Sequence, residues 1–165
     1  MVSADIKTVI KELEEYKKTL TRKLEHTVKG FAYELTMIAS SNTPIGSEEA
    51  IANNKRYAKY YHDRMVATGL PEQVGFHKGA WSADVVDSFE FEPSIYSNSS
   101  VAANAKQGVA SYKLGQTVFV GAEGLAFDLF EKGKNTQSPE GIVKPTEQMI
   151  KSMYQIHLER YFNEG

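Results

Sequence analysis

The sequence predicts an α+β fold, in which a long N-terminal helix and a C-terminal helix pack on a small, mostly antiparallel sheet. Three observations predict it: a helical apolar period over the first forty residues, a two-residue alternation at 81–92, and a second helical period after Pro145. A length of 165 residues fits one domain over 1–165. Residues 48–76 lack a strong period and are expected to be an insertion or an irregular segment.

The first helix is predicted by apolar side chains whose mean spacing is close to the helical repeat. They are Leu13, Tyr16, Leu20, Leu24, Val28, Phe31, Leu35 and Ile38. Ser3 is the expected N-cap, and the Ser-Ser-Asn-Thr-Pro run from Ser40 is expected to end the helix.

The length of this helix is itself informative. About 38 residues give roughly 57 Å of helix, whereas a compact domain of this size has a radius of gyration of about 15 Å. An unbroken helix would therefore extend beyond its own domain. Either it bends, for which Gly30 is the candidate, or another chain covers its apolar stripe.

Two strands and two further helices complete the expected fold. Residues 81–92 alternate apolar and polar side chains, and Thr117–Val120 form a short apolar run, so both are predicted strands. The small-residue stretch from Ser94 to Tyr112 is expected to form a helix on the sheet. The last helix is expected to open with Pro145 at its first position and to end near Phe162. It is apolar on two sides, which is typical of a helix held between elements or subunits.

Composition and motifs argue against a catalytic, metal or cofactor site in this chain. It has no cysteine, which excludes disulfides and thiol nucleophiles, and its four histidines show no metal-ligand spacing. No nucleotide-binding glycine loop or nucleophile-elbow motif is present. We therefore expect no catalytic residue, no metal and no cofactor. A net charge of −2 gives no general nucleic-acid footprint, and no apolar run is long enough for a membrane span.

Two other functions stay open at this stage. One is a small hydrolase that gathers His62 or His77 with Asp84 or Glu123. The predicted strand also carries two carboxylate pairs, Asp84 with Asp87 and Glu90 with Glu92, and Glu90 and Glu92 are expected to be solvated. The other is single-stranded nucleic-acid binding through residues 55–61, where Lys55, Arg56 and Lys59 alternate with tyrosines.

Four motifs, in order along the chain, resemble the tail-completion or neck proteins of tailed bacteriophages, the minor tail family of lambdoid siphophages. They are Thr43-Pro44-Ile45-Gly46-Ser47, Gly79-Ala80-Trp81, the Gly124–Gly133 segment and the Gln137–Thr146 segment. Leu125-Ala126 stands where the family has an aromatic residue before alanine, and residues 48–76 are an insertion relative to the family pattern.

The resemblance implies a virion protein without a catalytic site. It would form a ring, a hexamer in the virion, between the connector and the tail-terminator or tail-tube proteins, with the genome only passing through. It would reside in the tail or neck, and in the host cytoplasm during assembly, without a membrane. The residues expected to have structural or interface roles are Trp81, Phe127, Leu129, Glu131, Gly133, Gln137, Pro139, Gly141 and Pro145.

Overall fold

The structure, a computed structural model, describes residues 6–44, 59, 76–85, 98–122, 127, 131–132 and 138–165. Its elements follow the order α1 (Ile6–Asn42), α4 (Phe76–Gly79), β1 (Ser82–Asp84), α5 (Asn98–Gly108), β2 (Phe119–Gly121) and α7 (Val143–Glu164). This is an α+β fold with long N- and C-terminal helices, as predicted.

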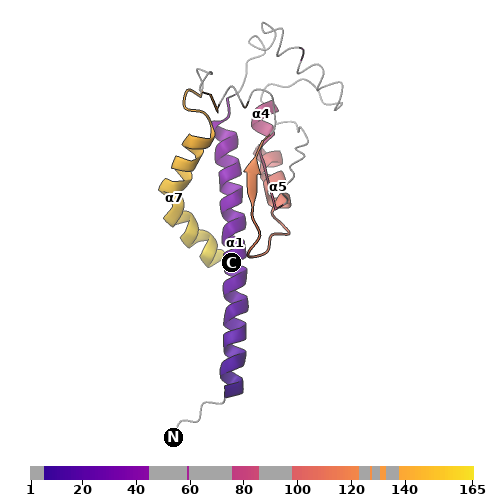
Figure 1. The fold of residues 1–165 in the computed structure, drawn as a ribbon, viewed down its shortest axis with the longest axis vertical. Helices are drawn as coiled ribbons and strands as arrows, with labels where there is room; N and C mark the ends of the chain where they lie inside the picture. The colour runs from indigo at the N-terminus through magenta and orange to yellow at the C-terminus, as the bar shows by residue number, and fades with distance from the viewer. Residues whose placement is uncertain are drawn as a thin grey trace.

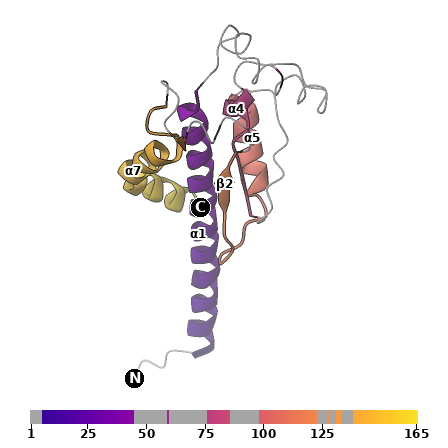
Figure 2. The same cartoon turned by 45° about the horizontal axis from the view of Figure 1, so that its top comes forward.

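Helix α1 is the axis of the molecule. In Figure 1 it stands vertically, with α7 along one side and α5 with the two strands along the other. The view of Figure 2 agrees: α7 and α5 lie on opposite sides of α1, so the upper part of α1 is enclosed by both. The sheet therefore contacts α1 and α5, and α7 packs on α1.

The sheet of the described residues has two antiparallel strands. Ser82 pairs with Gly121, Ala83 with Val120 and Asp84 with Phe119. Helix α5 covers the sheet so closely that a Cβ at Gly108 would lie 1.7 Å from the carbonyl oxygen of Ala83. The predicted strand 81–92 is confirmed over 82–84; Trp81 and Val85 flank the strand without belonging to it, and residues 86–92 lie outside the described residues.

Helix α1 does not bend at Gly30, so the bend, one of the two alternatives for this long helix, is wrong. The helix runs unbroken through residue 30, and the glycine is buried against α7. A Cβ at this position would lie 2.4 Å from the ring of Tyr161. Glycine is thus required by a close helix–helix approach, and the long helix does extend beyond its domain.

Helix α7 begins two residues earlier than predicted. Its first residue is Val143, so Pro145 is the third residue of the helix instead of the first, and Glu147 lies outside the first turn. The helix ends at Glu164, close to the predicted end. In the described ranges, no helix combines the length and the apolar character that crossing a bilayer requires.

Candidate interaction surface

The N-terminal part of α1 projects away from the rest of the molecule. Every residue from Ile6 to Thr19 is exposed, and Leu20 is the first that is half-buried. Figure 1 shows this part of α1 extending below the other described helices and strands. We call residues 6–19 the projecting segment.

Two sets of contacts mark where the rest of the molecule, the body, begins. On the α7 side, the Lys23 ammonium donates a hydrogen bond to the carbonyl of Phe162 (3.2 Å), near the end of the chain. On the α5 side, the backbone N–H of Leu114 donates to Glu25 (3.1 Å), and the Lys113 ammonium lies 3.7 Å from the same carboxylate. Helix residues before Lys23 therefore extend about 25 Å beyond the body.

The projecting segment carries a stripe of large apolar side chains that face solvent. They are Ile6 (74% exposed), Val9 (42%), Ile10 (51%), Leu13 (61%) and Tyr16 (67%). Scattered exposed apolar residues are ordinary on protein surfaces, whereas a contiguous apolar patch marks an interaction site. We call these five side chains the α1 stripe.

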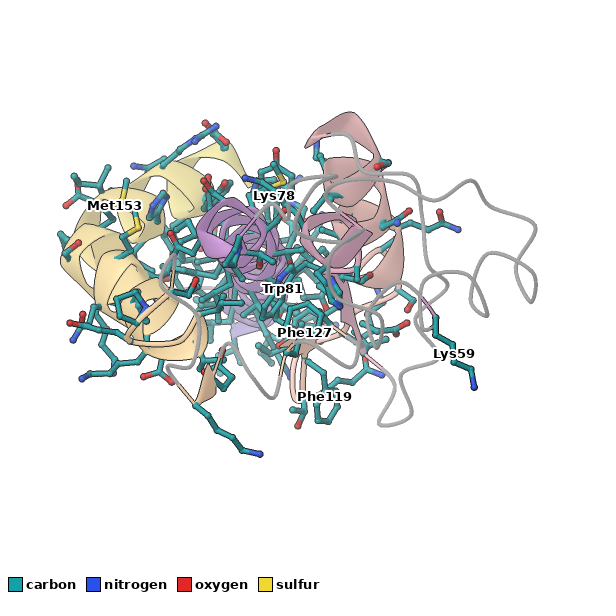
Figure 3. The ribbon with its side chains drawn as sticks, turned by 90° about the horizontal axis from the view of Figure 1, so that it is seen from above. Lys59, Lys78, Trp81, Phe119, Phe127 and Met153 are labelled. Atoms are coloured by element: carbon teal, nitrogen blue, oxygen red, sulfur yellow. The ribbon has the colours of Figure 1, made fainter. Side chains whose placement is uncertain are left out.

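A second exposed apolar set lies on the outer face of α7. Met149, Met153 and Ile156 follow each other at helical spacing and are 47%, 36% and 65% exposed. Figure 3 shows Met153 on the side of α7 that faces away from α1. The other apolar side of the helix packs on α1, where Tyr154 stacks on Phe31 with ring centroids 5.2 Å apart. One of the two apolar sides predicted for α7 is thus covered and the other is open.

Polar side chains are also held between α1 and α7. The Tyr161 hydroxyl donates a hydrogen bond to Glu34 (2.7 Å), and the Arg160 guanidinium lies 3.6 Å from the same carboxylate. Burial of the phenol, and next the hydrogen bond to Glu34, raise the pKa of Tyr161 well above its ordinary value. This cluster ties the two helices together.

His157 lies in the same interface. Its ring is buried, packs flat against Tyr161 and meets Phe31 edge-on, and neither ring nitrogen has a hydrogen-bond partner. Its Nδ1 lies 3.9 Å from Glu34 Oε1. The histidine lies among aromatic rings and is part of the packing between α1 and α7.

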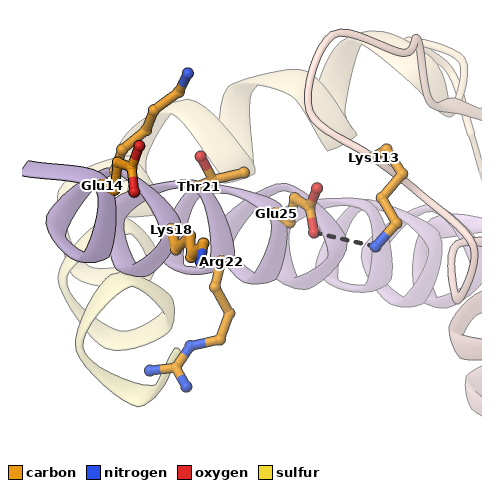
Figure 4. A pocket seen from close by; sticks show the side chains of 7 residues that line it. Glu14, Lys18, Thr21, Arg22, Glu25 and Lys113 are labelled. Carbon is orange, nitrogen blue, oxygen red and sulfur yellow. Dashed lines mark ion pairs between the residues drawn. The ribbon is translucent and has the colours of Figure 1, made fainter. Parts of the chain in front are cut away.

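One shallow hollow lies where the projecting segment meets the body. The side chains that line it are charged or polar, as Figure 4 shows, and its volume is about 500 Å³. The residues lining it are Glu14, Lys17, Lys18, Thr21, Arg22, Glu25 and Lys113. Its lining includes no histidine, and its Lys113 is paired with Glu25. The hollow therefore lies between the surface of α1 and the loop that contains Lys113.

Of the four residues considered for a hydrolase, the structure describes two, His77 and Asp84. The His77 imidazole is buried and meets the Phe127 ring edge-on at 5.4 Å. The Asp84 carboxylate accepts a hydrogen bond from the backbone N–H of Val85 (2.6 Å), at the end of β1. His62 and Glu123 lie outside the described residues. Within the part of the chain that the structure describes, no three acidic or histidine side chains are grouped to hold a metal ion.

The basic residues 55–61 and the carboxylates predicted on the strand after Asp84 lie mostly outside the described residues. Of residues 55–61, only Lys59 is described, and it is exposed. Asp87, Glu90 and Glu92 lie outside the described residues. The expected insertion, residues 48–76, also lies outside them except for Lys59 and Phe76.

Trp81 and Phe127, from separate motifs, meet in one part of the core. The Trp81 indole N–H donates a hydrogen bond to the Thr43 hydroxyl (2.6 Å), which links the first two motifs. The rings of Trp81 and Phe127 meet edge-on at 5.5 Å, which adds the third motif. Figure 3 shows both rings near the centre of the molecule. Together with Ala39, Val101 and Ile142 they form an apolar core cluster.

Glu131, Pro139 and Gly141 set up the start of α7. Glu131 accepts hydrogen bonds from the backbone N–H groups of Ile142 (2.9 Å) and Val143 (3.1 Å), two donors that have no partner within the helix. Pro139 lies in the turn that Gly141 closes by donating to Ser138 (3.1 Å). Gly141 has φ +80°, and a Cβ there would lie 2.8 Å from the Glu131 carboxylate. These residues shape the body.

Leu129, Gly133 and Gln137 lie outside the described residues, and Pro145 is half-buried in the first turn of α7. Two sets of exposed apolar residues are absent from the predicted interface residues, although the sequence indicated both: the α1 stripe and the outer face of α7. The signal for the first was the excess length of the helix. The signal for the second was the two-sided apolar pattern of α7.

Comparison with models of protein families, with curated proteins and with solved structures finds no match to this chain.

Proposed function

We propose that this chain is a structural component of a tailed-bacteriophage particle, a tail-completion or neck protein that joins the head connector to the tail tube. In this role it has no catalytic function. The observation that carries the proposal is the projecting segment, which holds five large apolar side chains in solvent beyond the body. A helix of this form stores binding surface for a neighbour, since leaving it exposed forgoes the free energy of burying it.

Two different apolar stripes support a ring. The α1 stripe and the outer face of α7, which consists of Met149, Met153 and Ile156, are separate surfaces of one chain. When one surface binds a different surface on the next copy, the contact is head-to-tail, and such contacts form a ring when the rotation between copies closes. We propose a hexameric ring in the virion, in contact with connector and tail-tube proteins.

Charge supports the same role. A protein that surrounds the DNA path must let the genome slide, and a strongly basic chain would hold it by its phosphates. The net charge of −2 avoids this strong attraction. The four resembling motifs add support, because Thr43, Trp81, Phe127 and Glu131 connect one motif to the next in space.

Deleting the gene from the virus or prophage that encodes it tests the proposal. We expect electron micrographs of lysates to show filled heads and separate tails that do not join, and the wild-type gene supplied in trans to restore joined particles. The protein should also be found in purified virions by mass spectrometry. Normal joined particles without the gene would contradict the proposal.

A further inference from the structure

The α1 stripe has the spacing of a coiled-coil seam. Ile6, Ile10, Leu13, Lys17 and Leu20 follow each other at alternating steps of four and three residues. Val9 and Tyr16 flank the seam on one side, whereas Lys7 and Glu14 flank it on the other. A seam of this kind is complete only when a second helix lies against it.

We infer that in the free protein the projecting segment pairs antiparallel with the same segment of a second copy. The two-fold axis lies between Lys11 and Glu12. In this register Ile10 lies beside Leu13 of the second copy, and Val9 lies beside its Tyr16. All five side chains of the stripe are then covered, and Lys17 lies at the edge of the seam beside Ile6, where its ammonium reaches water.

Charge selects this register over its neighbours. Lys7 lies beside Glu14 of the second copy, and the symmetry makes this pair twice. A register one heptad shorter places Lys7 opposite Lys7, and one a heptad longer places Glu14 opposite Glu14. A parallel pair places Lys17 opposite Lys17 within the seam. Like charges at these positions oppose pairing, so the antiparallel register with its axis between residues 11 and 12 is the favoured one.

The body leaves room for this pair. It begins at Lys23, where Phe162 and the chain end contact α1. In the inferred register, residue 6 of the second copy lies level with residue 17 of the first, short of the body. The second body begins beyond the first copy's Ile6. The two bodies therefore lie at opposite ends of the paired helices, and neither blocks the contact.

The apolar area is sufficient for a weak dimer. Given their exposed fractions, the five side chains offer roughly 600 Å² per copy, so the pair removes on the order of 1,000 Å² from water, near the lower bound for a specific interface. Such a contact forms at micromolar concentration and remains exchangeable. It covers the stripe until another protein takes its place.

This inference concerns the free protein and stands independently of the proposed function. A dimer could be found for a chain that joins no phage particle, and a neck protein could be a monomer before assembly. Hence the purified protein tests the pairing, whereas particle morphology tests the function.

Sedimentation velocity of the full chain over about 1–200 μM tests the pairing, because a dimer of this kind responds to concentration. We expect a monomer–dimer equilibrium for the wild type. Leu13→Glu should shift it to monomer throughout this range, since Leu13 is 61% exposed in the single chain and its replacement leaves the body intact. Leu114→Glu, a matched change at a 49% exposed leucine of the body, should leave the equilibrium unchanged.

A charge exchange tests the register. Lys7→Glu or Glu14→Lys alone converts two attractive pairs into two repulsive ones and should weaken the dimer by about five- to tenfold. The double variant restores attraction with the charges exchanged and should return the dissociation constant to within about twofold of wild type.

Three results would overturn the inference. They are a monomeric wild type at the highest concentration, a dimer that survives Leu13→Glu, and a double charge variant that dimerises no better than the single ones. The last result would mean that the chains pair in another register or through another surface.

Discussion

The two halves of α1 share one sequence pattern and differ in what covers it. Residues 6–19 are all exposed, whereas the half from Leu20 to Asn42 is largely enclosed by α7 on one side and by α5 and the sheet on the other. Apolar side chains recur at the same spacing in both halves. The difference therefore lies in which described elements pack around each half of the helix.

This comparison separates two kinds of apolar residue. In the enclosed half, small side chains such as Ala32 and Ala39 let neighbouring elements approach closely, and both are buried. In the projecting half, large side chains stay in solvent. The first set contributes to folding of one chain, whereas the second can contribute only to association. Substitutions in the first set should consequently change the free energy of unfolding, whereas substitutions in the second set should change association.

The largest expected effect is on the core that encloses α1. Trp81→Ala removes a buried ring that packs with Ala39 and donates a hydrogen bond to Thr43. We expect it to lower the free energy of unfolding by about 3–5 kcal/mol in urea denaturation. Ile6→Ala, at the far end of the projecting segment, should change it by less than about 0.5 kcal/mol in dilute protein. Equal losses in the two variants would refute the division of α1 into two halves.

The next effect is at the contact between α1 and α7. Gly30→Ala should lower the free energy of unfolding by about 1–3 kcal/mol, although alanine is the better helix former, because its Cβ would overlap the Tyr161 ring. Thr19→Ala, in the projecting segment, has no such neighbour and should be neutral or slightly stabilising. Thermal unfolding followed by circular dichroism measures both. A more stable Gly30→Ala variant would show that the two helices are not in close contact.

The sequence was sufficient for the features that depend on local pattern. The apolar period and the turn residues after Ser40 predicted α1. The helix length left two alternatives, a bend or an extension beyond the body, and the structure shows the extension. The approximate positions of β1 and β2 could also be predicted, because alternation and a short apolar run are local signals.

Features that depend on distant contacts were beyond the sequence. The start of α7 was misplaced because its first N–H groups are capped by Glu131, eleven residues before Ile142, instead of by an adjacent side chain. The role of Gly30 depended on Tyr161, which is distant in the chain. Of the interaction surface, the sequence indicated the α1 stripe, but only the structure shows which apolar side of α7 is open.

A smaller effect is expected at the N-terminus of α7, where Glu131 caps the helix. Glu131→Ala leaves two N-terminal donors of α7 without their acceptor and should cost about 1–2 kcal/mol. Glu140→Ala, an exposed carboxylate in the adjacent turn, is the matched control and should be neutral. Chemical denaturation of both variants measures the difference. If both lose the same stability, the carboxylate acts only by its charge and not as a cap.

The smallest effect is a dependence on alkaline pH. The pKa of Tyr161 is raised in the folded chain, so the folded state holds this proton more tightly than the unfolded state. Its contribution is therefore complete below about pH 10, the ordinary tyrosine value, and is lost as the pH rises above it. Tyr161→Phe should be about 1 kcal/mol less stable at pH 8, through loss of the bond to Glu34, and should lose less stability from pH 10 upward. Parallel alkaline profiles would contradict this.

The central claim is that the chain acts through the exposed stripe of the projecting segment. Its most direct test supplies Leu13→Glu or the control Leu114→Glu in trans to a virus that lacks the gene, and counts joined particles by electron microscopy. Both variants should keep the melting temperature of the wild type. The account predicts that Leu114→Glu restores joined particles and Leu13→Glu leaves heads and tails separate. Full joining by Leu13→Glu would contradict it.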